Sequence, residues 1–209
     1  MKIIKRSSKN TEQARTVSNM FNIVLVEVPL EKFFDRIELN IGEKEGFFIE
    51  KRSAKILLDH KNRYIQNSDR KAIKVLILHQ LFHAITRQYM KKLPHVIEDV
   101  IINKDLIKRG YGDDLLYFYY IHMVNHPKNI ENVEDFLELN IPWLSFFSLD
   151  SYNSEFLKKM INRFEGIKKF EPQSKKLFSA MEKDMLKERN QKIAINAYKS
   201  IINKCKKCK

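Results

Sequence analysis

Hydrophobic positions change their spacing several times along the chain, and each change predicts a new element. Asn22–Val28 is rich in β-branched residues and ends at Pro29, which predicts a strand. Leu30–Leu39 has apolar residues at helical spacing, with Pro29 where a proline can precede a helix. The polar and basic residues 1–20 predict an irregular arm or a weak helix. Two short apolar runs flanked by charge predict two more strands, at residues 45–50 and 54–59.

From there on the pattern is helical. Asn67, Ser68 and Asp69 can cap a long helix that runs from about Asp69 to Lys92. Pro94 then opens a second helix, which Gly110 ends. Further predicted segments are helices at 115–124, 131–139 and 152–164, an apolar connector at 141–149, a polar hinge at 168–176 and a long amphipathic helix from 174 onward. The fold class predicted is α+β, with a small N-terminal β-sheet and a helix, a buried central helix and a mostly helical C-terminal half.

The central helix carries two histidines among apolar residues. His79 and His83 lie four positions apart, so on a helix their directions differ by only about 40° and both imidazoles leave the same face. Two histidines at this spacing can bind one metal ion, as in the zinc motif H-E-x-x-H. Zn²⁺ is the metal that this donor set favours, and a catalytic zinc site of this kind needs a third protein ligand.

The next helix offers that ligand. Glu98 and Asp99 are the nearest downstream carboxylates, in its first turns. Asp99 shares a face with Asn103, beside the apolar stripe of the helix, so the spacing favours Asp99 as the ligand. Glu98 points another way, which leaves it as a candidate proton carrier; the choice between the two stays open.

These residues together resemble a known family. The string His79-Gln-Leu-Phe-His83, a following proline, Glu98-Asp-Val-Ile-Ile-Asn103 and Arg109-Gly-Tyr111 are similar to zincin-like metallopeptidases, a largely uncharacterised group found chiefly in archaea and bacteria. The resemblance covers roughly residues 45–125. It implies a zincin fold, with the histidine helix under a small sheet and an edge strand that aligns peptide. It also implies zinc bound by His79, His83 and an acid matching Asp99 or Glu98.

Gln80 departs from that family pattern, because it stands where the motif has its catalytic glutamate. A glutamine can hydrogen-bond a water molecule but cannot take its proton, and general acid–base assistance is worth about 100- to 10,000-fold in rate. The resemblance therefore implies a degenerate or atypical metallopeptidase that binds metal with little turnover. Glu98 is the one nearby acid that could replace the missing base.

The same sequence motif would also be found if the two histidines had only a structural role. Two buried imidazoles could instead be satisfied by backbone carbonyls or by a tyrosine, and Tyr117, Tyr119 and Tyr120 lie in the helix predicted at 115–124. Asp99 and Asn103 could likewise form a buried hydrogen-bonding pair.

Charge is concentrated at the C-terminal end. The 209 residues carry a formal net charge of +13; residues 158–209 hold 16 Lys or Arg against five Asp or Glu, and residues 1–157 hold 23 against 21. Such a tail is either a solvated helix face or a docking element for nucleic acid or the ribosome. The residues that we expect to contact phosphate are Lys183, Lys187, Arg189, Lys192 and Lys199.

The remaining features narrow the class of protein. The two cysteines, Cys205 and Cys208, form half of a zinc ribbon without a second half, and we interpret them as reduced thiols. The N-terminus lacks the apolar core of a signal peptide, and no run of about 18 apolar residues occurs, so we expect a cytoplasmic protein without a membrane span. We expect two domains, a zincin-like domain at 1–165 and a basic amphipathic helix at 166–209. A peptide or protein is the expected partner of the metal site.

Overall fold

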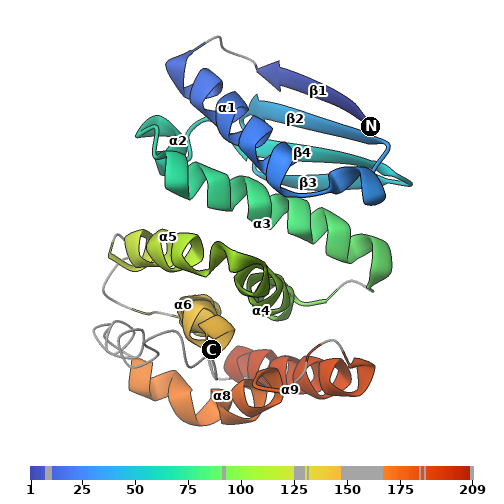
Figure 1. The fold of residues 1–209 in the computed structure, drawn as a ribbon. Helices are drawn as coiled ribbons and strands as arrows, with labels where there is room; N and C mark the ends of the chain where they lie inside the picture. Colours follow the sequence, from blue (N-terminus) through green and yellow to red (C-terminus); the bar gives the residue numbers. More distant parts are fainter. Residues whose placement is uncertain are drawn as a thin grey trace. The chain divides into compact units, whose positions relative to one another are not determined.

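The computed structural model describes residues 1–7, 11–90, 93–124, 130, 132–146, 167–183, 185 and 187–207. The chain divides into two compact units, Met1–Lys92 and Leu93–Lys209. The first holds a small sheet with helices and the second is helical, so the predicted α+β class is confirmed (Figure 1). The division expected after residue 165 stays a prediction. Among the described residues, no helix combines the length and the apolar character that a membrane crossing requires.

A four-stranded sheet is the centre of the first unit. Its strand order is β1-β2-β4-β3, with β1, β2 and β4 parallel and β3 antiparallel to β4 at one edge. The two short strands predicted at 45–50 and 54–59 are confirmed as β3 and β4. The strands are β1 (Lys2–Ser7), β2 (Arg36–Gly42), β3 (Gly46–Glu50) and β4 (Ser53–Asp59).

Helices cover one face of this sheet. Helices α1 and α3 pack against each other, and α3 also contacts β3 and β4 (Figure 1). Leu39 of β2 and Ile56 of β4 are register partners and are both fully buried, so their side of the sheet faces the helices. The helical elements of this unit are α1 (Glu12–Glu27), a 3₁₀ turn η1 (Leu30–Lys32), α2 (Arg63–Gln66) and α3 (Arg70–Tyr89).

Of the predictions for the first 40 residues, two are wrong and one is right in part. The irregular arm or weak helix expected at 1–20 is a strand at Lys2–Ser7 and a helix from Glu12 onward. The strand predicted at Asn22–Val28 is the end of that helix, α1. The side chain of Thr11 caps this helix by accepting a hydrogen bond from the Ala14 amide, and packing on the sheet outweighs the β-branched composition. Of the helix predicted at Leu30–Leu39, only the turn η1 forms. From Arg36 the chain is the strand β2, whose side chains point alternately to the two faces of the sheet.

The long helix predicted at Asp69–Lys92 is confirmed as α3. Asp69 is its N-cap, and its carboxylate accepts from the Ala72 amide at 3.0 Å. The helix ends at Tyr89, shortly before Leu93-Pro94. The cap fixes where the helix begins.

The second unit consists of helices. α4 starts directly after Pro94, and its regular geometry ends near Gly110, whose φ of +93° suits a residue without a side chain. α6 packs against α4, α5 and α8, and α8 packs against α9. The elements are α4 (His95–Leu106), a π-helical segment η2 (Ile107–Tyr111), α5 (Gly112–Val124), α6 (Val133–Phe146), α8 (Ile167–Met181) and α9 (Glu188–Lys207).

The C-terminal third differs from its predicted pattern. The connector expected at 141–149 is helical up to Phe146, because α6 continues through Pro142. The polar hinge expected at 168–176 lies inside α8, and the single helix expected from 174 is interrupted between Met181 and Glu188. α8 and α9 each have an apolar stripe, and the two helices pack against each other. They can bury these stripes in one interface only because the chain turns between them. The helix predicted at 152–164 lies outside the described residues.

The opposite face of the sheet holds a buried carboxylate among cations. Glu38 alternates with the core residues of β2 and is only 7% exposed. Arg36 donates a hydrogen bond to it at 3.1 Å, and Arg6 and Lys55 lie 3.4 and 3.5 Å from its oxygens. Burial raises the pKa of Glu38, but the hydrogen bond from Arg36 and the charges of Arg6 and Lys55 together outweigh it and hold the pKa below its usual value.

The substitution Glu38→Gln tests this cluster. Glutamine keeps the shape but leaves three cations facing one another, so we expect the free energy of unfolding in urea to fall by roughly 1–2 kcal/mol at pH 7. The pKa is lower in the folded than in the unfolded chain. The stabilisation is therefore complete above the unfolded value of about 4.3, and it disappears as the pH falls through the folded value.

The control is Glu50→Gln, which removes an exposed carboxylate from the same face and should have little effect. A Glu38→Gln deficit as large below pH 4 as at pH 7 would contradict the electrostatic explanation.

Candidate metal centre

The centre of the candidate site is a pair of imidazoles on α3. The Nε2 atoms of His79 and His83 lie 3.0 Å apart, and the ring centroids are 4.6 Å apart at an interplanar angle of 78°. His83 is 3% exposed and His79 is half-buried. The two side chains therefore converge on one point beside the helix, as their spacing predicts.

This geometry suits two arrangements. At 3.0 Å one neutral ring can donate its Nε2–H to the Nε2 of the other. Alternatively, both lone pairs can face one cation. Two nitrogens at zinc–ligand distances of 2.0–2.1 Å in a tetrahedron are about 3.3 Å apart, so a small opening of the pair would admit the metal.

The edge strand β3 holds one of the rings. Phe47 stacks on His83 with centroids 5.3 Å apart and ring planes only 11° apart. Phe47 is the register partner of the buried Ile56, so it points from the sheet towards the helices. The guanidinium of Arg87, one turn beyond His83, lies 6.0 Å from the centroid of the Phe47 ring. The stack restricts the rotation of His83 and so pre-organises the pair.

Two adjacent carboxylates are buried at the start of α4. Glu98 is 1% exposed and Asp99 is 4% exposed. Asp99 Oδ2 lies 3.0 Å from His95 Nδ1, one turn earlier on the same helix. Because a buried charge is costly, such groups are normally paired or bound to a metal. The helical spacing predicts that only Asp99 lies near the core, whereas both acids are buried.

Asn103 anchors α4 within its own unit. Its side-chain amide is fully buried and donates to the Tyr119 hydroxyl on α5 at 2.5 Å and to Ser145 Oγ on α6 at 3.2 Å. Asn103 is one turn from Asp99, so this network fixes the rotation of the helix that presents the carboxylate. Tyr119, considered from the sequence as a partner for the histidines, bonds to Asn103.

His79, His83 and Asp99 form a group that could hold a metal ion, each with one ligand atom to offer. The three residues are those that the sequence singles out as ligands. Glu98 is not part of the group. Gln80 is half-buried on α3, one position after His79.

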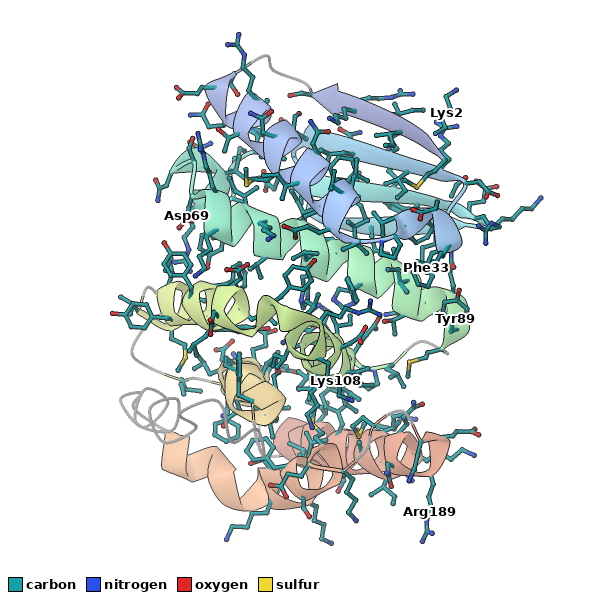
Figure 2. The ribbon with its side chains drawn as sticks, in the orientation of Figure 1. Lys2, Phe33, Asp69, Tyr89, Lys108 and Arg189 are labelled. Atoms are coloured by element: carbon teal, nitrogen blue, oxygen red, sulfur yellow. The ribbon has the colours of Figure 1, made fainter. Side chains whose placement is uncertain are left out.

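The predicted tail residues are all exposed. Lys183 and Lys187 lie in the segment between α8 and α9, and the other three lie on α9. Lys192 forms an ion pair with Glu188 at 3.1 Å. Figure 2 shows Arg189 extending from the α9 ribbon. The side chain of Cys205 and all of Cys208 lie outside the described part of the chain.

Two contacts were not predicted from the sequence. Phe47 gives no sequence signal for its contact with His83, because the pairing depends on the sheet register. His95 does give one, since it is four residues from Asp99 on a helix, and this spacing brings side chains together.

Comparison with protein-family models, with curated proteins and with solved structures found no match to this chain. The resemblance to zincin-like metallopeptidases therefore remains an expectation, based on the histidine motif and the acidic helix.

Proposed function

We propose that this chain is a zinc-binding protein of the zincin-like type, with His79, His83 and Asp99 as ligands. The observation that carries the proposal is the convergence of the two Nε2 atoms, 3.0 Å apart, with His83 almost fully buried. The antiparallel edge strand β3, in contact with the histidine helix, agrees with the arrangement that the resemblance implies.

The donor set suits zinc. Two neutral imidazoles and one carboxylate are a common protein ligand set for a zinc ion that keeps one further position for substrate or solvent. His95 would orient Asp99 through the 3.0 Å contact, as partners of metal ligands commonly do. Phe47 would do the same for His83 by stacking. A bound zinc would supply Lewis-acid polarisation of a carbonyl group.

Gln80 decides what such a site can do. Its amide can donate a hydrogen bond to a water or to a substrate carbonyl, and its carbonyl can accept one, but it cannot hold a transferred proton. The protein would therefore be a degenerate metallopeptidase that binds peptide, or an atypical hydrolase in which Glu98 carries the proton. A peptide or protein is the partner proposed for this site.

Zinc content tests the proposal directly. Protein prepared without a histidine tag and measured by inductively coupled plasma mass spectrometry should contain one zinc per chain. His79→Ala should lose it, because one imidazole cannot replace two. His79 is half-buried, so this substitution perturbs the core less than one at His83 would.

The neighbouring acids provide the matched control. Asp99→Asn should lower the zinc affinity at least tenfold, whereas Glu98→Gln should leave it close to that of the original chain. Circular dichroism checks that each variant is folded. Zinc well below one per chain, and equal in His79→Ala, would rule out the metal centre.

Restoring the motif tests the catalytic part. Gln80→Glu supplies the missing base, so we expect hydrolysis of a fluorogenic peptide library to rise by about 100- to 10,000-fold in the zinc-loaded protein. Adding His79→Ala should abolish the gain. A zinc-loaded Gln80→Glu protein without any gain would mean that the site binds but does not cleave peptide.

A second candidate function is polyanion binding by the C-terminal helices, with nucleic acid or a ribosomal surface as the partner. It is favoured by an open groove of about 550 Å³ between α8 and α9, whose lining includes Lys175, Lys176 and Lys183. Of the five exposed cations predicted from the sequence, Lys183 belongs to this groove, Lys187 follows it before α9, and Arg189, Lys192 and Lys199 lie on α9.

Replacing those five cations by glutamine tests this function. If each neutralises one phosphate of a 20-bp duplex DNA, the slope of log affinity against log salt should decrease by about 4–5. Fluorescence anisotropy between 50 and 200 mM NaCl measures that slope. An unchanged slope would show that this surface does not bind the duplex.

A further inference from the structure

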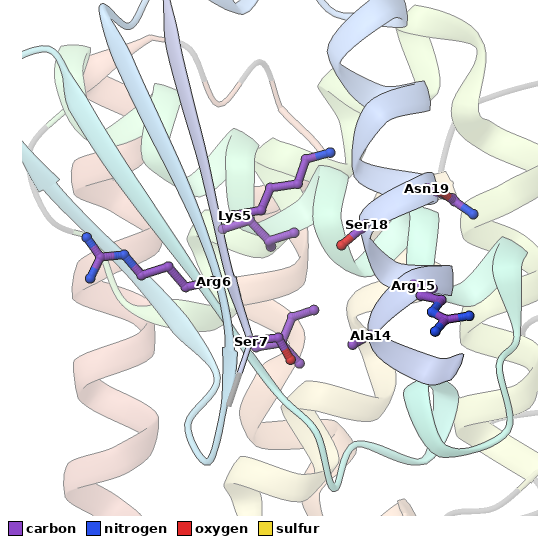
Figure 3. A pocket seen from close by; sticks show the side chains of 9 residues that line it. Lys5, Arg6, Ser7, Ala14, Arg15, Ser18 and Asn19 are labelled. Carbon is purple, nitrogen blue, oxygen red and sulfur yellow. The ribbon is translucent and has the colours of Figure 1, made fainter. Parts of the chain in front are cut away.

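The sheet face turned away from α1 and α3 has a composition that the metal centre does not explain. In Figure 3, Arg6 points away from α1, whereas Lys5 and Ser7 lie on the side of β1 that faces it. By alternation and register, Glu38 and Lys55 share the Arg6 side. The residues of this face fall into four rows across the strands: Glu50, Ser53, Arg36 and Lys2; Phe48, Lys55, Glu38 and Ile4; Gly46, Leu57, Asn40 and Arg6; and Asp59 and Gly42.

One large aromatic ring is exposed on this face. Phe48 is 64% exposed, although its neighbour Phe47 points to the helices and is only half-exposed. Its register partner is Lys55, and Leu57 lies two residues further along β4. A phenyl ring left in water gives up the stabilisation that burial of an apolar side chain brings. Phe48 contributes little to the core, so its ring is accessible to a planar partner molecule.

In the cluster beside Phe48, positively charged side chains outnumber carboxylates. Arg6, Arg36 and Lys55 surround the single carboxylate of Glu38, which leaves that cluster with two positive charges in excess. Their side chains are 63%, 44% and 41% exposed, so an anion can reach them from solvent. They lie on three adjacent strands, about 4.8 Å apart from strand to strand and 6.6 Å between alternate residues.

We propose that this face binds single-stranded nucleic acid, with a base stacked on Phe48 and phosphates at Arg6, Arg36 and Lys55. Stacking on an aromatic side chain beside a cationic surface is how sequence-tolerant single-strand binding works. In a duplex the base faces are covered by their neighbours, so the ring would have nothing to stack on. An acidic peptide could use the cations but would leave Phe48 without a planar partner. The proposal is independent of the metal centre.

The full-length chain and fluorescein-labelled oligouridylate of 15 nucleotides provide the test, by fluorescence anisotropy. Phe48→Ala should weaken binding by roughly 5- to 150-fold, the range for loss of one stacked base. Tyr89→Ala removes an aromatic residue that is 68% exposed elsewhere in the unit, so it should bind as the original chain does. The double variant Arg36→Gln, Lys55→Gln should reduce the salt slope by about 1.4.

Competition identifies the class of ligand. Unlabelled oligouridylate should displace the probe far better than a duplex or a polyglutamate peptide of equal length. Equal binding by Phe48→Ala and the original chain would overturn the proposal, as would polyglutamate competing equally well. A loss of oligouridylate binding in the variant that lacks the five C-terminal cations, with none in the sheet variants, would overturn it too.

Discussion

The account depends on one geometric constraint, the near-superposition of residues four apart on an α-helix. It directs His79 and His83 to the same point, and the packing of α3 against α1, β3 and β4 holds the helix in place. Once the rings converge in an environment poor in water, two outcomes remain. They share a proton through a hydrogen bond, or they share a cation. Everything proposed about zinc follows from the second outcome.

The second unit buries polar side chains on helix α4, and each of them needs a compensating interaction. Glu98, Asp99 and Asn103 are all buried, on a helix whose other residues are mostly aliphatic. A sequence selected only for packing would avoid three such side chains, because each must be compensated. Asn103 is explained by its bonds to Tyr119 and Ser145. For the two acids, the function proposed above assigns a metal ligand, Asp99, and a proton carrier, Glu98.

Because side chains alternate along a strand, the two faces of the sheet carry different functional residues. On β3, Phe47 points inward and stacks on His83, while Phe48 points outward beside Lys55. One strand thus supports the candidate metal centre on one side and the proposed nucleic-acid surface on the other. Nothing in the geometry of β3 couples the metal centre to the nucleic-acid surface, so either proposal can be correct without the other.

Local signals in the sequence predicted the parts of the fold that they control. The cap at Asp69, the break at Pro94 and the stop near Gly110 are set by nearby residues, and α3 and α4 follow from them. Asn22–Val28 was mistaken for a strand because its β-branched residues suit either structure, and only packing on the sheet decides. The turn between α8 and α9 also depends on tertiary burial. The histidine pair was predictable from spacing, whereas the contact of Phe47 with His83 depends on strand register, which no local pattern encodes.

The most direct test of the central claim is anomalous diffraction from crystals of the untagged protein, collected on both sides of the zinc absorption edge. The account predicts an anomalous peak within about 2.0–2.1 Å of both Nε2 atoms, with an Asp99 oxygen as a third ligand. Density without a peak, in which the two imidazoles remain hydrogen-bonded to each other, would contradict it.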